Sequence, residues 1–378
     1  MNARSAALHA LIAWQQKGTF LWDFLESWKN RESPDKRELD FAYELACQTA
    51  RYLGYLEHVA KKLTTALPKK QSERLLLYLG LYQRIFLKNI PLYAVVSTTV
   101  ELAKNLTFSH FARFLNAVLR KEIPEDSPDC ITLHSYPEFF KNCLLNQYGK
   151  EKMLELLTVM NHPSICMATT YTDGKIDNRC YETPPESSYI QNCTPVQLVT
   201  TLAKTIQKTP THILDLCAAP GGKTLLLAHL FPEAHLIAHD LPHKEKRLLE
   251  NVHRFAPNVK VVTNHEAFAD RKFDLILVDA PCSNSGVLYK CPEARWRLSQ
   301  ESLDQLEQVQ IELIKQAITH LQKGGTLWYM TCSILQQENE AFVEKLQKTL
   351  GLTLNQFLLC LPDQKGQEGG FAASFSIN

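Results

Sequence analysis

The 378-residue sequence lacks several features that mark specialised classes of protein. Its first residues contain no apolar signal-peptide core, and no apolar run is long enough to span a bilayer. Its eleven cysteines include no Cys-x-x-Cys pair, so the sequence indicates neither a disulfide framework nor a zinc site. It also contains no internal repeat and no low-complexity tract. We therefore expect a monomeric cytoplasmic protein that needs no membrane and no metal.

Charge is distributed unevenly along the chain, although the formal net charge is only +1. Residues 1–121 contain 18 Lys and Arg against 10 Asp and Glu, whereas the remainder contains 23 against 30. A basic first third is typical of proteins that bind a polyanion such as nucleic acid. An ordinary solvated helical surface explains the same excess, so charge alone does not decide between them.

One stretch joins a short apolar run to a turn of small residues. Residues 213–216 predict a buried strand, and residues 223–230 predict a helix. A strand that runs through a glycine turn into a helix is the nucleotide-binding corner of a doubly wound sheet. Gly221 and Gly222 let the backbone approach a ligand there because they carry no Cβ.

The end of this turn, Gly222-Lys-Thr224, could be mistaken for the phosphate-binding loop of an NTPase. Residues 276–279 could pass for the strand that holds the metal of such an enzyme. The phosphate-binding motif requires a glycine five residues before Gly222, and this sequence has Cys217 at that position. An NTPase is therefore disfavoured, and only measurable ATP turnover would revive it.

Residues 3–121 carry the apolar periodicity of a helical bundle. The run Leu75–Tyr82 is apolar nearly all round, which predicts a central, buried helix. Further helices are expected from Pro91, a residue suited to the first helical position, and over residues 111–119. Five or six helices result in all.

Four motifs occur in order along this predicted bundle. They are Arg4-x-x-Ala7-x-x-x-Leu11, Pro91-x-x-Ala94-Val95, Val100-Glu-Leu-Ala-Lys104 and Phe114-Leu-Asn-Ala-Val-Leu-Arg120. Together they resemble the NusB-type RNA-binding bundle, although Ser97-Thr-Thr99 stands where that family usually has an acidic residue. The resemblance implies a helical RNA-binding domain over residues 1–123.

A connector is expected over residues 124–194, opened by Pro124 and Pro128. It should hold helical segments up to Gly149 and from 151 to 160, then an irregular part with brief strand-like pieces near 165–171. From residue 195 the pattern alternates between strand and helix, which predicts a mostly parallel sheet covered on both faces. The candidate strands are 213–216, 235–239, 259–263, 274–279, 325–330, 354–360 and 370–376, and the candidate helices are 196–207, 223–231, 243–254, 303–321 and 336–348.

Several reactive side chains follow these strands, at the edge where ligands bind in such sheets. Asp240 follows strand 235–239, and it either accepts hydrogen bonds from ribose hydroxyls or caps the next helix. Asp279 and Cys282 follow strand 274–279, and Cys332 follows strand 325–330. A single cysteine at a strand end is usually a small core residue, but two at one edge favour a catalytic role.

Two thiols and a carboxylate suit methylation of a pyrimidine at C5. A thiolate adds to C6, and C5 then becomes nucleophilic toward the methyl group of a sulfonium. The carboxylate can assist the addition by protonating the ring, and a base afterwards removes the C5 proton. Spacing alone does not say whether Cys282 or Cys332 attacks.

A set of motifs over residues 195–378 then carries a second resemblance. The set comprises Asp215-Leu-Cys-Ala-Ala-Pro-Gly-Gly-Lys-Thr224, Asp279-Ala-Pro-Cys-Ser283, Arg295-Trp296, Lys323-Gly-Gly325, Tyr329-x-Thr-Cys-Ser333, Glu338-Asn-Glu340 and Glu368-Gly-Gly-Phe371. It resembles the Sun-type RNA cytosine-5 methyltransferases, whose bacterial branch with a NusB-like domain modifies 16S ribosomal RNA. The resemblance implies a Rossmann-like class I domain, S-adenosylmethionine as methyl donor and 16S rRNA as partner.

The resemblance also implies roles for individual residues. Cys332 would be the nucleophile, and Cys282 would assist release of the methylated product. Asp240 would hold the ribose of the donor, and Asp279 would face both its methionine end and the target base. Lys223 would contact RNA or Asp279. The turn that wraps the donor would comprise Cys217, Ala218, Ala219, Pro220, Gly221, Gly222 and Lys223.

The sequence departs from the family at two places. At the end of the third strand, where the family has an acidic residue that contacts adenine, this chain has His265 followed by Glu266. The connector is shorter than in the family and ends in Tyr189–Thr194, which puts the strength of RNA binding in question. Two questions stay open. Tyr289, Arg295 and Trp296 either contact RNA or pack locally. The chain is either an enzyme or a non-catalytic assembly factor, and the joint presence of Asp279 and both cysteines disfavours the assembly factor.

Overall fold

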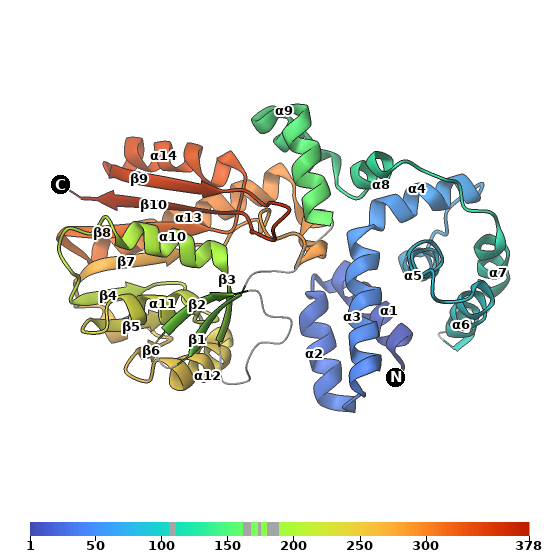
Figure 1. Cartoon of the computed structure of the whole chain (residues 1–378), viewed down its shortest axis with the longest axis horizontal. Helices are drawn as coiled ribbons and strands as arrows, with labels where there is room; N and C mark the ends of the chain where they lie inside the picture. The colour runs from blue at the N-terminus through green and yellow to red at the C-terminus, as the bar shows by residue number, and fades with distance from the viewer. Residues whose placement is uncertain (106–110, 162–167, 173–174, 180–188, 378) are drawn as a thin grey trace. The chain divides into compact units, whose positions relative to one another are not determined.

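The computed structural model describes residues 1–105, 111–161, 168–172, 175–179 and 189–377 (Figure 1). The chain divides into two compact units. Unit 1 comprises residues 1–142, 153–161 and 289–297, and unit 2 comprises residues 143–152, 162–288 and 298–378. The domain boundaries expected near residues 123 and 194 stay predictions. No helix among the described residues is long and apolar enough to cross a membrane.

Unit 1 is a helical bundle, as the sequence predicted, with seven helices in the described part of residues 1–121. The extra helices arise where a single residue interrupts the helical pattern: Gly18, left-handed at φ 68°, ends one helix, and Tyr52 separates two others. The central helix is confirmed, since every residue from Leu75 to Gln83 is buried. The helices are α1 (Ala3–Lys17), α2 (Leu21–Glu32), α3 (Lys36–Arg51), α4 (Leu53–Leu63), α5 (Gln71–Phe86), α6 (Leu92–Asn105), α7 (Ala112–Arg120) and α8 (Pro128–His134).

The segment 289–297 belongs to unit 1, and its Arg295 side chain is fully buried. The Arg295 guanidinium donates to the carbonyl oxygens of Arg51 (3.2 Å) and Ser135 (3.0 Å) and to Asn161 Oδ1 (2.8 Å). Its Cζ lies 4.0 Å from the ring centroid of Tyr136. Burial lowers the pKa of Arg295 to about 10, so the group stays charged at neutral pH. Of the two alternatives for this arginine, the structure shows local packing.

Unit 2 contains a seven-stranded sheet in the order β6-β5-β4-β7-β8-β10-β9, in which only β10 runs antiparallel to both its neighbours. The predicted strands and helices are confirmed within a few residues. The strands are β4 (His212–Asp215), β5 (His235–His239), β6 (Lys260–Val262), β7 (Phe273–Asp279), β8 (Leu321–Thr331), β9 (Thr353–Cys360) and β10 (Gly370–Ser376), and the helices are α10 (Cys193–Ala203), α11 (Gly222–Leu230), α12 (Glu245–Phe255), α13 (Gln300–His320) and α14 (Glu340–Leu350).

Helices cover both faces of this sheet, because side chains alternate between the two faces along each buried strand. Within β7, Leu275 and Leu277 join the core formed with α10, α11 and α12. Ile276 and Val278, which point to the opposite face, join the core formed with α13 and α14. The alternation leaves the strand ends as the place where polar side chains gather.

The part of the connector that the structure describes is more regular than the sequence suggested. Helix α9 (Glu138–Asn161) is broken at Gly149, where φ is 75°, as the two predicted helical segments required. Strands β1 (Ala168–Thr172), β2 (Lys175–Arg179) and β3 (Tyr189–Asn192) form an antiparallel sheet in the order β2-β1-β3. The expected strand-like pieces before residue 168 lie outside the described residues.

Arg295→Ala should lower the free energy of unfolding by about 3 kcal/mol or more. The substitution removes the donor that serves three buried acceptors and leaves a cavity beneath Tyr136. Urea denaturation followed by tryptophan fluorescence measures the change. The matched control is Arg297→Ala on the same segment, whose side chain is exposed and which should cost about 1 kcal/mol or less. Equal losses for the two variants would contradict the packing role of Arg295.

Candidate active site

The glycine turn is fastened to the strands on both sides of β4. Leu216 N donates to the carbonyl oxygen of Leu277 in β7, and Ala218 N donates to that of His239 in β5, each at 2.9 Å. Gly221, at φ 109°, precedes α11 in a conformation that other residues rarely adopt. A Cβ on Gly222 would lie 3.0 Å from polar side-chain atoms of β3. The turn is therefore a rigid element at the carboxyl edge of the sheet.

Asp215, the last residue of β4, is fully buried beneath this turn. Its Oδ2 accepts a hydrogen bond of 2.6 Å from Thr224 Oγ1 in α11. Burial raises the pKa of Asp215 to about 7, and the charges of Asp279 and Asp240 act in the same direction. The carboxyl group therefore joins β4 to α11 and does not face solvent.

Asp240 connects the end of β5 to the glycine turn. Its Oδ2 accepts from Ala219 N at 2.9 Å, and its Oδ1 accepts from Leu241 N at 2.7 Å. Lys244 Nζ lies 3.3 Å from Oδ1. The cap of the following 3-10 helix is Leu241, so the capping alternative for Asp240 does not hold. Beside its bond from Ala219 N, Oδ2 keeps a further lone pair that a ribose hydroxyl could use.

His265 opens the short 3-10 helix after β6, and its ring lies against His239, with centroids 4.1 Å apart. Burial and the neighbouring His239 lower the pKa of His265, so the imidazole is neutral at physiological pH. Glu266 Oε2 accepts from Asn264 Nδ2 at 3.1 Å. Of the two residues at this position, His265 is therefore the one beside the end of β5.

The two cysteines at the strand ends are brought together, with Cys282 Sγ and Cys332 Sγ 3.1 Å apart. Cys332 Sγ also donates to Asn284 Oδ1 at 3.0 Å, and Gly286 N donates to the carbonyl oxygen of Cys332 at 2.9 Å. A Cβ on Gly286 would lie 2.7 Å from that carbonyl oxygen, so only glycine permits this approach. The sequence placed both thiols at one edge, and the loop geometry puts their sulfur atoms in contact.

The two thiols are not equivalent. The hydrogen bond with Cys332, followed by burial, raises the pKa of Cys282 well above its ordinary value. Cys282 therefore stays a neutral thiol that can donate to Cys332 Sγ. A thiolate at Cys332 would be stabilised by such a donor.

Lys223, at the start of α11, pairs with Asp279 at the end of β7, with Nζ and Oδ2 2.6 Å apart. Burial alone would lower the pKa of Lys223, but the charges of Asp279 and Cys332 outweigh it and raise the pKa. The side chain is therefore an ammonium group beside both the carboxylate and the nucleophile candidate. Of the two partners expected for Lys223, the structure shows Asp279.

Comparisons with known proteins agree with this geometry. Residues 200–375 match the profile of the family described as 16S rRNA methyltransferase RsmB/F, and residues 1–123 match the NusB family. A ribosomal RNA small subunit methyltransferase B from Proteus mirabilis is 30% identical over 420 residues, covering 98% of each chain. The chain belongs to the RsmB family of 16S rRNA methyltransferases.

A further relative and a solved structure are similar over nearly the whole chain. An Escherichia coli ribosomal RNA small subunit methyltransferase B is 26% identical and covers 97% of this chain and 94% of its own. The crystal structure of PH0851 has a TM-score of 0.76 at 18% identity, covering 99% of this chain and 98% of its own. Because the 420 aligned positions of the Proteus mirabilis protein exceed the 378 residues of this chain, that relative carries insertions relative to it.

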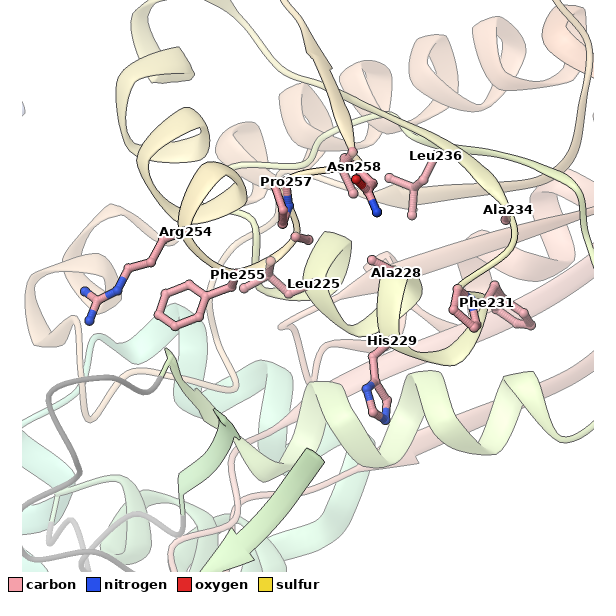
Figure 2. Close-up of a pocket in the computed structure, with 13 residues that line it drawn as sticks. Leu225, Ala228, His229, Phe231, Ala234, Leu236, Arg254, Phe255, Pro257 and Asn258 are labelled. Carbon is pink, nitrogen blue, oxygen red and sulfur yellow. The ribbon is translucent and has the colours of Figure 1, made fainter. Parts of the chain in front are cut away.

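S-adenosylmethionine is the methyl donor of the RsmB family. The residues at the edge of this sheet fit such a group, since a buried carboxylate at Asp240 suits the ribose and the neutral ring of His265 suits a purine. The first N–H groups of α11 have no partner inside the helix and suit the donor's carboxylate. An open hollow of about 720 Å³ lies elsewhere, around Leu236 and Val259 at the amino ends of β5 and β6, and no residue of this site lines it (Figure 2).

The family motif Glu338-Asn-Glu340 supports both cysteine loops, a role that sequence reasoning missed. Glu338 is fully buried, and its Oε1 accepts from Ser283 N at 2.8 Å, next to Cys282. Asn339 Oδ1 accepts from Thr331 Oγ1 at 2.8 Å, and its Nδ2 donates to the carbonyl oxygen of Ser333 at 3.0 Å, on either side of Cys332. The only signal in the sequence was the motif itself.

Asp215→Asn should change how stability depends on pH. Because the folded pKa of Asp215 is about 7, above the ordinary value of 3.8, its contribution is complete below pH 3.8 and is lost as pH rises toward 7. Asparagine does not titrate, so the free energy of unfolding of the variant should rise relative to that of the wild type by about 1.4 kcal/mol per pH unit over this window. Urea unfolding at intervals from pH 4 to pH 8 measures the difference.

Asp274→Asn provides a control of opposite sign. Burial alone would raise the pKa of Asp274, but hydrogen bonds from Thr211 and His212 lower it. Its contribution is therefore present above the ordinary pKa and lost as pH falls, so this variant should lose stability at neutral pH and little in acid. Parallel pH profiles for the wild type and Asp215→Asn would mean that Asp215 is ionised throughout.

Proposed function

We propose that this protein methylates C5 of a cytosine in 16S ribosomal RNA through a covalent bond between Cys332 Sγ and C6 of the base. The contact of 3.1 Å between the sulfur atoms of Cys282 and Cys332 carries the proposal. A methyltransferase that acts on a nitrogen or an oxygen needs no pair of thiols beside its donor site. Membership of the RsmB family agrees with RNA as the substrate.

The donor site of the proposal is the carboxyl edge of β4, β5, β6 and β7. The turn from Cys217 to Lys223 wraps the donor, Asp240 holds its ribose, and His265 lies against its adenine. When bound, S-adenosylmethionine supplies a methyl group on a positively charged sulfur, which makes that carbon electrophilic. Asp279 faces the charged end of the donor and the target base.

The chain's own residues then perform the following steps. Cys332 Sγ, as thiolate, forms a bond to C6, and the electron pair of the C5–C6 double bond moves into the ring while N3 takes a proton that the Lys223 ammonium passes through Asp279. N3 returns this proton to the same pair when the C5–C6 double bond re-forms. C5 forms a bond to the methyl carbon, and the bond from that carbon to the donor sulfur breaks. A base then takes the C5 proton, the C5–C6 double bond re-forms and the bond to Cys332 Sγ breaks. Cys282 assists this last step.

The hydrogen bond between the two thiols supports this division of roles. Because the pKa of Cys282 is raised, Cys282 keeps its proton and can donate a hydrogen bond to Cys332 Sγ. The ammonium group of Lys223 stabilises negative charge on Cys332 Sγ and keeps Asp279 in position. These pairings favour Cys332 as the nucleophile on physical grounds that the sequence did not offer.

The basic helical domain over residues 1–123 would supply most of the grip on the RNA backbone. The connector over residues 124–194 would add contacts, and residues 195–378 would carry the chemistry. Attack at C6 requires access to the face of the ring, so the cytosine must be unpaired or flipped out of a helix. We expect the enzyme to act as a monomer in the cytoplasm.

Cys332→Ala should abolish methyl transfer, because no other group replaces the bond to C6. Transfer of tritiated methyl groups to naked 16S rRNA and to assembled small subunits, followed by mapping of the modified base, measures it. Cys360→Ala, a buried cysteine at the end of β9, is the matched control and should keep full activity. Undiminished transfer by Cys332→Ala would make the nucleophile assignment wrong, and no transfer by the wild type to either substrate would favour an assembly factor.

Cys282→Ala should trap the enzyme on its RNA. Without the second thiol the adduct forms but breaks down slowly, so a protein–RNA band of reduced mobility should persist on a denaturing gel. The double variant Cys282→Ala, Cys332→Ala should not form this band. A band that appears with Cys332→Ala alone would reverse the two roles, and a band that survives in the double variant would mean that neither cysteine forms the adduct.

A further inference from the structure

Three side chains with metal-binding atoms converge in unit 1, far along the sequence from the methyltransferase motifs. They are His58 in α4 and Cys130 and His134 in α8, and their ligand atoms all lie within 4.8 Å of one another. Cys130 Sγ is 4.0 Å from His58 Nε2, and the two imidazole centroids are 3.9 Å apart.

Asp126 adds a fourth potential ligand to this cluster. Its Oδ1 lies 3.6 Å from Cys130 Sγ and 3.9 Å from His58 Nε2. The side chain is only 8% exposed, and its Oδ2 is buried without a hydrogen-bond partner among the described residues. Lys62 Nζ lies 2.7 Å from Oδ1, but the Lys62 side chain is 40% exposed and can move into solvent. In the structure the Lys62 ammonium neutralises this buried carboxylate, and a metal ion would take over that role once Lys62 turns into solvent.

The backbone that carries these side chains is fixed from two sides. Cys130 and His134 are four residues apart on one face of α8. A Cβ on Gly54 would lie 2.3 Å from the carbonyl oxygen of His134, so glycine lets α4 approach the end of α8. The next carbonyl oxygen, that of Ser135, accepts from the buried Arg295. The ligands therefore sit on elements that packing already holds together.

The donor set suits zinc. Tetrahedral Zn²⁺ binds sulfur at about 2.3 Å and nitrogen or oxygen at about 2.0–2.2 Å, which places its ligand atoms roughly 3.3–3.8 Å apart. The observed separations of 3.6–4.0 Å around Cys130 and His58 are near this range. The rings of His58 and His134 are stacked at 21° to one another, so one imidazole must rotate before both ring nitrogens face the same ion. One thiolate, two imidazoles and a carboxylate select Zn²⁺ or Co²⁺ over Mg²⁺ and Ca²⁺, which prefer oxygen alone.

We propose that His58, Cys130, His134 and Asp126 form a structural zinc site that ties α8 to α4. The site takes part in no step of methyl transfer, and the proposal stands whether or not the proposed function holds. It departs from the expectation of a metal-free protein, which depended on the absence of Cys-x-x-Cys pairs. Here Cys130 lies 72 positions after His58, so the four proposed ligands do not form a short sequence motif.

Cobalt titration of the full-length protein tests the site, because a thiolate bound to Co²⁺ gives a charge-transfer band in the near ultraviolet and tetrahedral Co²⁺ absorbs in the visible. The titration uses a chain in which Cys282 and Cys332 are both serine, so that this second pair of thiols contributes no signal. One equivalent of Co²⁺ should produce both bands, and Zn²⁺ should abolish them by displacement. In this background Cys130→Ser should eliminate the charge-transfer band and weaken Zn²⁺ binding at least about 100-fold.

Two further variants make the test specific. Asp126→Asn should weaken Zn²⁺ binding about 10-fold, because the amide oxygen is a poorer ligand than the carboxylate. Cys143→Ser, at a half-buried cysteine outside the cluster, should change neither the bands nor the affinity. Absence of both bands in the parent chain, or bands that persist unchanged in Cys130→Ser, would overturn the proposal, whatever the methyltransferase activity of the wild type proves to be.

Discussion

The active site depends on the close parallel pairing of β7 and β8, which delivers two loops to the same point at the edge of the sheet. The register continues past the strands, since Ala280 N donates to the carbonyl oxygen of Met330 at 2.9 Å and Gly286 N to that of Cys332. Two sulfur atoms can touch only if both loops keep this register. Glu338 and Asn339 maintain it by accepting from, or donating to, residues adjacent to each cysteine. The backbone register of β7, β8 and their loops therefore determines where the two thiols of the candidate site lie.

The carboxyl groups and the thiols at the strand ends have different electrostatic surroundings. Three carboxyl groups, those of Asp215, Asp240 and Asp279, end neighbouring strands, and full burial raises the pKa of Asp215 to about 7. Asp240 accepts from Ala219 N and lies near Lys244, and Asp279 pairs with Lys223. The thiols divide in the same way, because Cys282 keeps its proton while Lys223 lies near Cys332. Burial and one well-placed lysine thus set the different roles of otherwise equivalent side chains.

Much of this arrangement follows from the sequence, and the exceptions share a physical cause. The alternation of strand and helix patterns located β4 to β10, because burial gives each element a periodic pattern of apolar residues. The positions of Asp240, Asp279 and the two cysteines at strand ends made them candidate site residues. The pattern could not rank the thiols, because the pKa of Cys282 depends on a partner 50 residues away. It gave no role to Glu338 for the same reason. The connector was harder still, since short strands without a long apolar face carry little periodic signal.

Arg295 shows how the same limit affects expectations about RNA binding. An arginine beside a tryptophan on a long loop has the composition of an RNA-binding segment. The Arg295 guanidinium instead donates hydrogen bonds to the carbonyl oxygens of Arg51 and Ser135 inside unit 1. The chain leaves unit 2 after Leu288, contributes nine residues to unit 1 and returns at Leu298. Residues 289–297 therefore take part in packing within unit 1. Exposed side chains of unit 1 such as Lys69, Lys70 and Lys88 carry positive charge on its surface.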